Sequence, residues 1–286
     1  MGLTRFLTVR YSMEAIEQRQ AIRLARRLMI CRRGGVSSFS MTLNIAHRGA
    51  SALAPENTMA AFEKAVELGA DAIELDLHVS RDGELVVIHD HTLDRTTDGR
   101  GPVDARSLQE LKRLDAGRWF GESFVGQRIP TLAEVLDRFA GKVPLALEVK
   151  AGSAFFPGIE ERVVSALRKH QVFSQVAVAS FDHHALLRLK ELEPRLRTGA
   201  LLVGRPVSLP TVAGPSKADA MALECSLVTK TEVDACRAAG LQLVVWVVNA
   251  PAQMRYFIDL GVDGIITDSP DLLHQVLSER RESLPA

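Results

Sequence analysis

The chain has 286 residues, 47% of them hydrophobic, and equal numbers of basic and acidic residues leave it without net charge. This composition excludes a disordered chain, and the length fits one large domain or two modest ones. Residues 1–40 hold eight Arg and two Glu, whereas the remainder holds 27 basic and 33 acidic residues. An acidic main body argues against nucleic acid as the partner.

The N-terminal segment and the cysteines bear on location. We interpret residues 1–40 as an N-terminal extension, disordered or helical, outside the catalytic domain; a targeting role is the second interpretation. No run approaches the roughly 18 apolar residues of a membrane span, and no secretory signal pattern is present. The three cysteines have neither CxxC spacing nor an even count, which disfavours disulfides and zinc. A cytoplasmic protein without a stable membrane anchor is expected.

Apolar runs alternate with helical patterns from Leu43 onward, over roughly the 250 residues that a (β/α)8 TIM barrel needs. Asn57 is the expected N-cap of the first helix and Gly69 its C′ residue; later helices are expected near 158–169, 183–192, 230–239 and 251–260. A doubly wound open sheet is the alternative, but no GxGxxG follows the first strand. Strands are predicted at 43–47, 71–77, 85–89, 144–149, 175–180, 198–202, 219–223, 242–248 and 263–267.

Nine strands are one more than a barrel takes. The step from Leu77 to Leu85 is too short for a helical crossover, and Ser80-Arg81-Asp82-Gly83 is typical of a hairpin turn. Which segment is extra stays open. Residues 91–130 lack a strand pattern, so we expect a small inserted cap beside the mouth of a barrel domain spanning 41–286.

Two carboxylates alternate with apolar residues in Ala72-Ile73-Glu74-Leu75-Asp76-Leu77. Side chains at i and i+2 of a strand share one face, so Glu74 and Asp76 project together. Glu148 and Lys150 repeat this arrangement in a second strand. Both opposite faces are apolar and suit packing under helices, so the charged faces point inward. Inward carboxylates need compensation, which predicts a site for a hard divalent cation.

Further polar residues stand where predicted strands end: His47 and Arg48 after the first, His89 after the third. The carboxyl ends of barrel strands converge on one mouth. Two imidazoles can act as base and acid near neutral pH, and Arg48 with Lys150 suits an anionic group. Cation, acid/base pair and basic clamp together indicate phosphoryl transfer.

The chain resembles the glycerophosphodiester phosphodiesterase family of the phosphatidylinositol phospholipase C-like barrels. The resemblance runs in order from about residue 44 to 275. It rests on His47-Arg48-Gly49, Pro55-Glu56-Asn57-Thr58, Glu74-Leu75-Asp76, His89-Asp90, Leu93-Asp94-Arg95-Thr96-Thr97, Glu148-Val149-Lys150, Ser180-Phe181, Trp246-Val247-Val248-Asn249 and Gly264-Ile265-Ile266-Thr267-Asp268.

The resemblance implies metal-dependent hydrolysis of a small glycerophosphodiester, such as glycerophosphocholine, to glycerol 3-phosphate and an alcohol. It implies one divalent cation, Mg²⁺ or Ca²⁺. Val247 stands where the family usually has Thr, which we expect to affect substrate fit. The roles implied are metal ligand for Glu74, Asp76 and Glu148, general acid or base for His47 and His89, phosphate contact for Arg48 and Lys150, and substrate-pocket lining for Trp246.

Several alternatives stay open. The three carboxylates could form buried ion pairs, Lys150 could be only the partner of Glu148, and Trp246 only a core aromatic. Pro55–Thr58 is explained as a helix start and Thr267–Pro270 as a strand end with a helix cap. A lysophospholipase D-type activity would need an apolar rim, which 91–130 does not supply, and a non-catalytic phospho-ligand-binding barrel would not need both imidazoles. Head group, oligomeric state and the assignment of acid and base are left undecided.

Overall fold

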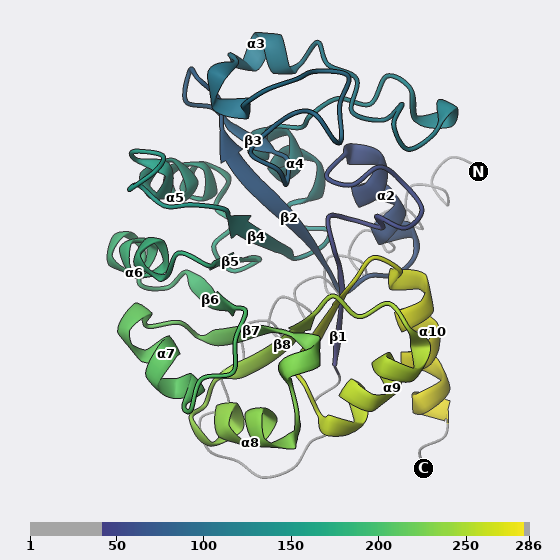
Figure 1. Ribbon diagram of the computed structural model, residues 1–286, viewed down its shortest axis with the longest axis vertical. Coiled ribbons are helices and arrows are strands. Elements are labelled where there is room, and N and C mark those ends of the chain that lie inside the picture. The colour runs from purple at the N-terminus through teal and green to yellow at the C-terminus, as the bar shows by residue number, and fades with distance from the viewer. Residues whose placement is uncertain (1–41, 283–286) are drawn as a thin grey trace, which may run out of the picture.

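Eight parallel strands close into a barrel with helices outside them, which confirms the predicted (β/α)8 fold (Figure 1). The computed structural model describes residues 42–282, so the extension expected at 1–40 lies outside the described residues. The strand order is β1-β9-β8-β7-β6-β5-β4-β2, and pairing of β1 with β2 closes the ring. The barrel strands are β1 (Leu43–Ala46), β2 (Ala72–Val79), β4 (Leu145–Val149), β5 (Val176–Ser180), β6 (Arg197–Leu202), β7 (Ala220–Glu224), β8 (Gln242–Trp246) and β9 (Gly264–Thr267).

The ninth strand, β3 (Leu85–Val87), is the extra one. It pairs antiparallel with the end of β2, with Leu77 opposite Val87, so it forms a hairpin on the barrel rather than a barrel strand. The turn at 80–83 is the predicted hairpin turn, and Gly83 adopts φ +88° there. A backbone turn of this kind leaves no room for a helix between the two strands.

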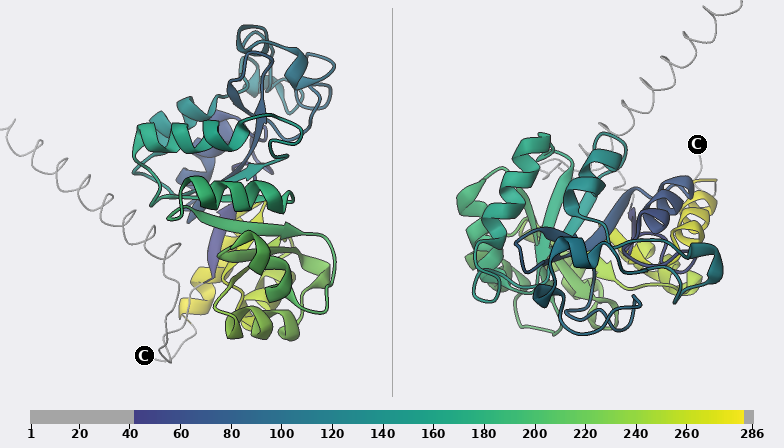
Figure 2. Two further views of the ribbon diagram at one scale, coloured as in Figure 1. Left: turned by 90° about the vertical axis from the view of Figure 1, so that its left-hand side faces the viewer. Right: turned by 90° about the horizontal axis from the view of Figure 1, so that it is seen from above.

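Helices connect most of the barrel strands and lie outside the ring in two perpendicular views (Figure 2). They include α10, whose start matches the helix cap expected at Thr267–Pro270, and α4, which was not predicted. The helix α7 was not predicted either, because Gly214 and Pro215 both disfavour helix. In residues 42–282 no helix is both long and apolar enough to cross a bilayer. The helices are α2 (Met59–Glu67), α3 (Leu108–Leu111), α4 (Leu132–Phe139), α5 (Ile159–His170), α6 (His183–Leu192), α7 (Leu209–Ser216), α8 (Lys230–Ala238), α9 (Pro251–Leu260) and α10 (Pro270–Glu282).

The start of α2 corrects one prediction. Thr58, not Asn57, is the N-cap, and its hydroxyl accepts a hydrogen bond from the Ala61 amide. Asn57 adopts a left-handed φ of +56° and turns its side chain to Asp76 instead. Asparagine tolerates this conformation better than most residues. The expected C′ residue is correct, since Gly69 follows the C-cap with φ +75°.

Residues 88–130, between β3 and α4, form a lobe beyond the end of the β2–β3 hairpin (Figures 1 and 2). The lobe contains α3 and the short 3-10 helices η1 (Val103–Ala105) and η2 (Glu122–Phe124). It has its own small apolar cluster, which includes Leu93, Val103 and Leu111. Asp115 ties part of it together by accepting backbone hydrogen bonds from Gly117, Arg118 and Gly126.

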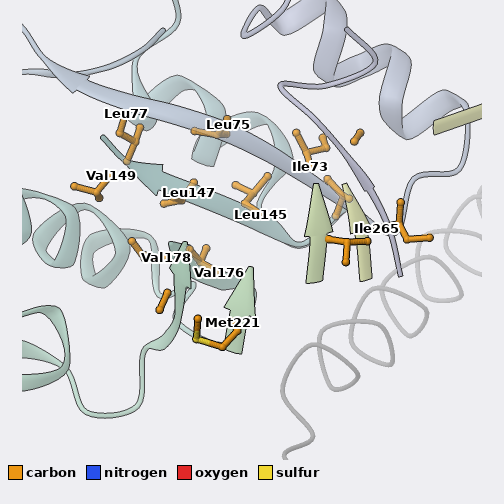
Figure 3. Packing of buried hydrophobic residues seen from close by; sticks show 14 of the residues in the cluster. Ile73, Leu75, Leu77, Leu145, Leu147, Val149, Val176, Val178, Met221 and Ile265 are labelled. Atoms are coloured by element: carbon orange, nitrogen blue, oxygen red, sulfur yellow. The ribbon is translucent and has the colours of Figure 1, made fainter. Parts of the chain in front are cut away.

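The main core lies between the barrel and its helices. Alternate residues of β2 and β4, among them Ile73, Leu75 and Leu147, are fully buried and pack outward against the helices (Figure 3). A second, smaller cluster of Leu43, Ile45, Ala72 and Ile266, with Val244 and Trp246 against it, belongs to the opposite faces of β1, β2, β8 and β9. By the two-residue period of a strand, these residues share the inward face with Glu74 and Asp76. They form an apolar floor inside the barrel.

Candidate active site

Three carboxylates meet at the carboxyl ends of β2 and β4. Glu74, Asp76 and Glu148 each offer one oxygen, and these oxygens lie within 4.8 Å of one another. The ladder explains the meeting, because Asp76 stands opposite Glu148 and Glu74 stands one inward position earlier, opposite Ala146. Glu74 and Asp76 are buried, with 6% and 1% of their surfaces exposed. Oxygen atoms so arranged are the donor set that Mg²⁺ and Ca²⁺ prefer.

Two basic side chains lie against this cluster. Lys150 Nζ is 2.7 Å from Asp76 Oδ1 and 2.8 Å from Glu148 Oε1. Arg48 Nε is 3.4 Å from Asp76 Oδ2, and the Arg48 amide donates to Glu74 Oε2 at 2.9 Å. The alternative in which Lys150 is the salt-bridge partner of Glu148 therefore describes a contact that exists, and Asp76 shares it.

The surroundings shift the pKa values of the three carboxyl groups in different directions. Burial raises the pKa of Glu74 well above its ordinary value, and the neighbouring charges of Asp76 and Glu148 add to this effect. Burial also raises the pKa of Glu148 despite Lys150. Although burial opposes it, Lys150 and Arg48 hold the pKa of Asp76 below its ordinary value. Without a further cation, burial and crowding therefore oppose full ionisation of the three carboxylates.

His47 stands at the end of β1 and is paired with Asp268 at the end of β9, at 2.6 Å between Nδ1 and Oδ1. Ser51 and Asn249 also donate to Asp268, at 2.9 and 2.6 Å. Burial opposes ionisation of Asp268, but the His47 hydrogen bond lowers its pKa to about 2. An ionised carboxylate at Nδ1 accepts the Nδ1–H group, which leaves Nε2 as the ring nitrogen that can exchange a proton.

His89 follows β3 and has a similar partner. Its Nδ1 lies 2.6 Å from Asp90 Oδ1. Burial lowers the pKa of His89, and the negative charge of Asp76 opposes this only in part. Arg95 holds Asp90 through two hydrogen bonds, of 2.8 and 3.0 Å. Both imidazoles of the predicted pair are thus oriented at Nδ1 by a carboxylate.

Trp246 ends β8, half-buried above the apolar floor, and meets Phe181 edge to face with ring centroids 5.7 Å apart. Three other histidines make ordinary structural contacts. His78 and His183 contact backbone carbonyls at 3.0 Å, and His170 contacts one at 2.8 Å. None of these three is needed to build the carboxylate cluster.

Sequence reasoning missed three contributors to the site. Asp268 was interpreted as part of a strand end and helix cap, Asn57 as a helix cap, and Glu56 as part of a helix start. Asn57 donates to Asp76 at 2.7 Å, and Glu56 bridges Arg48 and Arg95. The position of Asp268 in the sequence could have identified it. Asp268 directly follows the last predicted strand, as His47 follows the first, and the first and last strands of a closed barrel are neighbours.

Fold and site together define a (β/α)8-barrel enzyme with its acidic cluster and imidazole–carboxylate pairs at the carboxyl ends of the strands. The glycerophosphoryl diester phosphodiesterase family model matches residues 47–272. This match covers most of the chain and every residue of the site described above. The chain belongs to this family.

Relatives agree over nearly their whole length. The glycerophosphodiester phosphodiesterase of Caldanaerobacter subterraneus is 44% identical over 233 residues, covering 81% of this chain and 96% of that protein. The enzyme of the same name from Bacillus subtilis is 37% identical, with 85% and 89% covered. Among solved structures, an Oleispira antarctica phosphodiesterase in complex with the product sn-glycerol-3-phosphate is 29% identical with a TM-score of 0.79, covering 83% of this chain and 97% of that one.

Proposed function

We propose that this protein hydrolyses glycerophosphodiesters to sn-glycerol 3-phosphate and an alcohol, with one divalent cation, Mg²⁺ or Ca²⁺, held by Glu74, Asp76 and Glu148. The observation that carries the proposal is the convergence of this acidic cluster with two carboxylate-paired imidazoles at one barrel mouth. The names of the Caldanaerobacter and Bacillus relatives and the product bound to the Oleispira protein support the substrate class.

The donor set fits a divalent cation. Asp76 Oδ1 and Glu148 Oε1 are buried and take no well-directed hydrogen bond among the described residues, although Lys150 lies within ion-pair distance of both. Such oxygens have unused lone pairs, which is costly unless a cation binds. A bound divalent cation would offset charge on the phosphoryl oxygens and lower the pKa of a nearby hydroxyl or water.

The protein's own groups would supply binding and proton transfer. Arg48 and Lys150, which lie against the acidic cluster, would contact the phosphate. Trp246 would line the pocket for the glycerol or alcohol part. Because Nδ1 of each imidazole is paired with a carboxylate, Nε2 of one ring would take a proton from the attacking hydroxyl, and Nε2 of the other would give one to the leaving alkoxide. Free thiols at Cys225 and Cys236 support a reducing, cytoplasmic setting.

The direct test is release of glycerol 3-phosphate from glycerophosphocholine by purified protein, with Mg²⁺, Ca²⁺ or a chelator. We expect product with at least one cation and none with the chelator. Folded protein that releases no product with any divalent cation would contradict the proposal. Product formation unaffected by the chelator would reject only the cation.

The imidazole role has its own test. His47→Ala should lower kcat by about 100-fold or more, the usual contribution of a general acid or base. Cation affinity, measured by calorimetry, should change little, because His47 is not among the three ligands. His274→Ala is the matched control, since His274 is exposed on α10. A His47→Ala enzyme with near-normal turnover would remove His47 from the mechanism.

A second candidate substrate class, a lysolipid, is favoured by one observation. Exposed apolar side chains stand on the loops after three neighbouring strands: Phe155 after β4, Phe181 after β5, and Val203 with Val207 after β6. The loops after barrel strands surround the mouth, so an apolar rim would come from these loops and not from 91–130. Apolar groups gathered beside a polar site suit a substrate that keeps an acyl chain.

Two substrates with the same head group separate the candidates. Glycerophosphocholine and lysophosphatidylcholine differ in the acyl chain, so their kcat/KM ratio reports on the rim. If the rim binds the chain, Phe155→Ser lowers turnover of the lysolipid and leaves glycerophosphocholine unaffected. Tyr256→Ser, on the outer helix α9, changes neither. Turnover of glycerophosphocholine alone rejects the lysolipid.

A further inference from the structure

Glu56 has contacts that a helix start does not require. Its side chain is only 12% exposed, and its carboxylate binds two guanidinium groups at once. Arg48 Nη1 donates to Oε1 at 2.8 Å, while Arg95 Nη1 and Nη2 donate to Oε2 and Oε1 at 2.7 and 2.8 Å. The cap of α2 is supplied by Thr58 instead. The buried charge of Glu56 therefore has another purpose.

The contacts continue to a catalytic candidate. From Arg95, hydrogen bonds of 2.8 and 3.0 Å reach Asp90, and Asp90 Oδ1 lies 2.6 Å from His89 Nδ1. On its other side, Glu56 holds Arg48, whose Nε is 3.4 Å from Asp76 Oδ2. One line of charged contacts therefore runs from Arg48, the arginine proposed to contact the phosphate, to the imidazole of His89. In order, its members are Arg48, Glu56, Arg95, Asp90 and His89.

Charge alternates along this line. Two guanidinium groups face two carboxylates, so the set is neutral and each carboxylate is shared. Burial opposes ionisation of Glu56, but hydrogen bonds from Arg95 and the charge of Arg48 keep its pKa below the ordinary value. Paired contacts between a carboxylate and the arginine fork fix direction as well as distance. The line is therefore suited to hold the Arg48 guanidinium and the His89 ring at a fixed distance and orientation to each other.

We propose that Glu56 is a positioning residue that anchors both Arg48 and, through Arg95 and Asp90, His89. The loop after β1 and the segment after β3 are far apart in sequence, and this carboxylate links them directly. Phosphate binding and proton transfer then share one support. The inference rests on the proposed function, because it takes the roles of Arg48 and His89 from it.

The test separates the two branches. Glu56→Gln should raise the Kd for glycerol 3-phosphate and lower kcat, each by about 10-fold or more, since small misplacements of reacting groups can cost 100-fold. Arg95→Met should lower kcat similarly but leave that Kd within about twofold, because Arg48 keeps Glu56. Glu63→Gln is the control: Glu63 is on α2, half-exposed, and pairs with Arg138 on the surface. It should change neither quantity.

Two results would overturn the proposal. One is a folded Glu56→Gln variant with kcat and Kd near those of the unaltered protein. The other is an Arg95→Met variant that weakens glycerol 3-phosphate binding as much as Glu56→Gln does, since Arg95 would then act as a phosphate ligand itself. If Glu56→Gln does not fold, Arg95→Lys is the deciding variant, because Lys keeps the positive charge but cannot donate the paired hydrogen bonds of a guanidinium. A lowered kcat would support the positioning role of the line, and an unchanged kcat would reject it.

Failure of the proposed function gives a different pattern. The unaltered protein would then show no turnover with any cation, whatever residue 56 is. Binding of glycerol 3-phosphate to Glu56→Gln and Glu63→Gln still tests the Arg48 branch in that case. A selective loss in Glu56→Gln supports the anchor, and equal affinities reject it.

Discussion

Asp268 holds the side chain of His47 in place. It lies beside His47 across the β1–β9 pair and accepts hydrogen bonds from Ser51 and Asn249 as well. With both carboxylate oxygens occupied, the side chain cannot rotate freely. The carboxylate therefore holds the His47 ring with Nδ1 toward it, which would suit the proposed role of His47 as general acid or base.

Asp268→Asn should lower kcat by about 100-fold or more, because an amide can direct its NH₂ group at Nδ1 and select the wrong tautomer. Binding of glycerol 3-phosphate should change much less. Asp259→Asn serves as the control, since Asp259 is exposed on α9 and pairs with Arg280. Equal kcat in the two variants would mean that His47 needs no carboxylate.

The same substitution predicts a pH effect on stability. The pKa of Asp268 falls from 3.8 to about 2 on folding, so its charge stabilises the fold fully above pH 3.8, and this is lost as pH falls through about 2. With one third of the side chain exposed, we expect about 1 to 2 kcal/mol. Urea unfolding of both proteins should show this difference at pH 7 and a smaller one at pH 2.5. A constant difference would assign the effect to packing.

At the scale of elements, the register of β2 with β4 decides where the acidic cluster forms. A shift of one residue would turn Glu74 and Asp76 toward the helices and Ile73 and Leu75 into the barrel. The buried outer face therefore protects the register that the site needs.

The lobe at 88–130 is stabilised differently from the barrel. Its apolar cluster is small, and hydrogen bonds to Asp115 hold its loop.

Asp115→Ala should loosen the loop from 115 to 126, because three backbone N–H groups lose their acceptor at about 1 kcal/mol each. Hydrogen exchange should accelerate there and not in the barrel strands. Asp104→Ala, in η1 of the same lobe, is the control. Faster exchange throughout the barrel would show that the lobe and barrel unfold together.

For the whole molecule, cation binding and folding should be linked. A cation that binds only the folded protein adds about 2.7 kcal/mol at 100 times its Kd, which raises Tm by roughly 5 °C for a chain of this size. Melting in Mg²⁺, Ca²⁺ and chelator measures the shift. Glu74→Gln keeps the shape but removes one ligand charge and should reduce it. An equal shift in both proteins would place the cation elsewhere.

The sequence alone determined the fold class, because two-residue and helical periods record which face of each element is buried. Every barrel strand was predicted to within two residues of its ends, and the alternation in β2 identified two of the three carboxylates. The charge pattern and ordered motifs also indicated the family.

Only the tertiary structure decided which residues share the site. The structure shows that β3 is the hairpin strand and that Thr58, not Asn57, is the helix cap. It also shows that Asp268 contacts His47 and that Glu56 lies between two arginines. Periodicity reports the face on which a residue lies, but not which residue of another strand or loop stands beside it. Barrel closure sets those neighbours, by bringing β1 against β9 and the segment after β3 against the loop after β1.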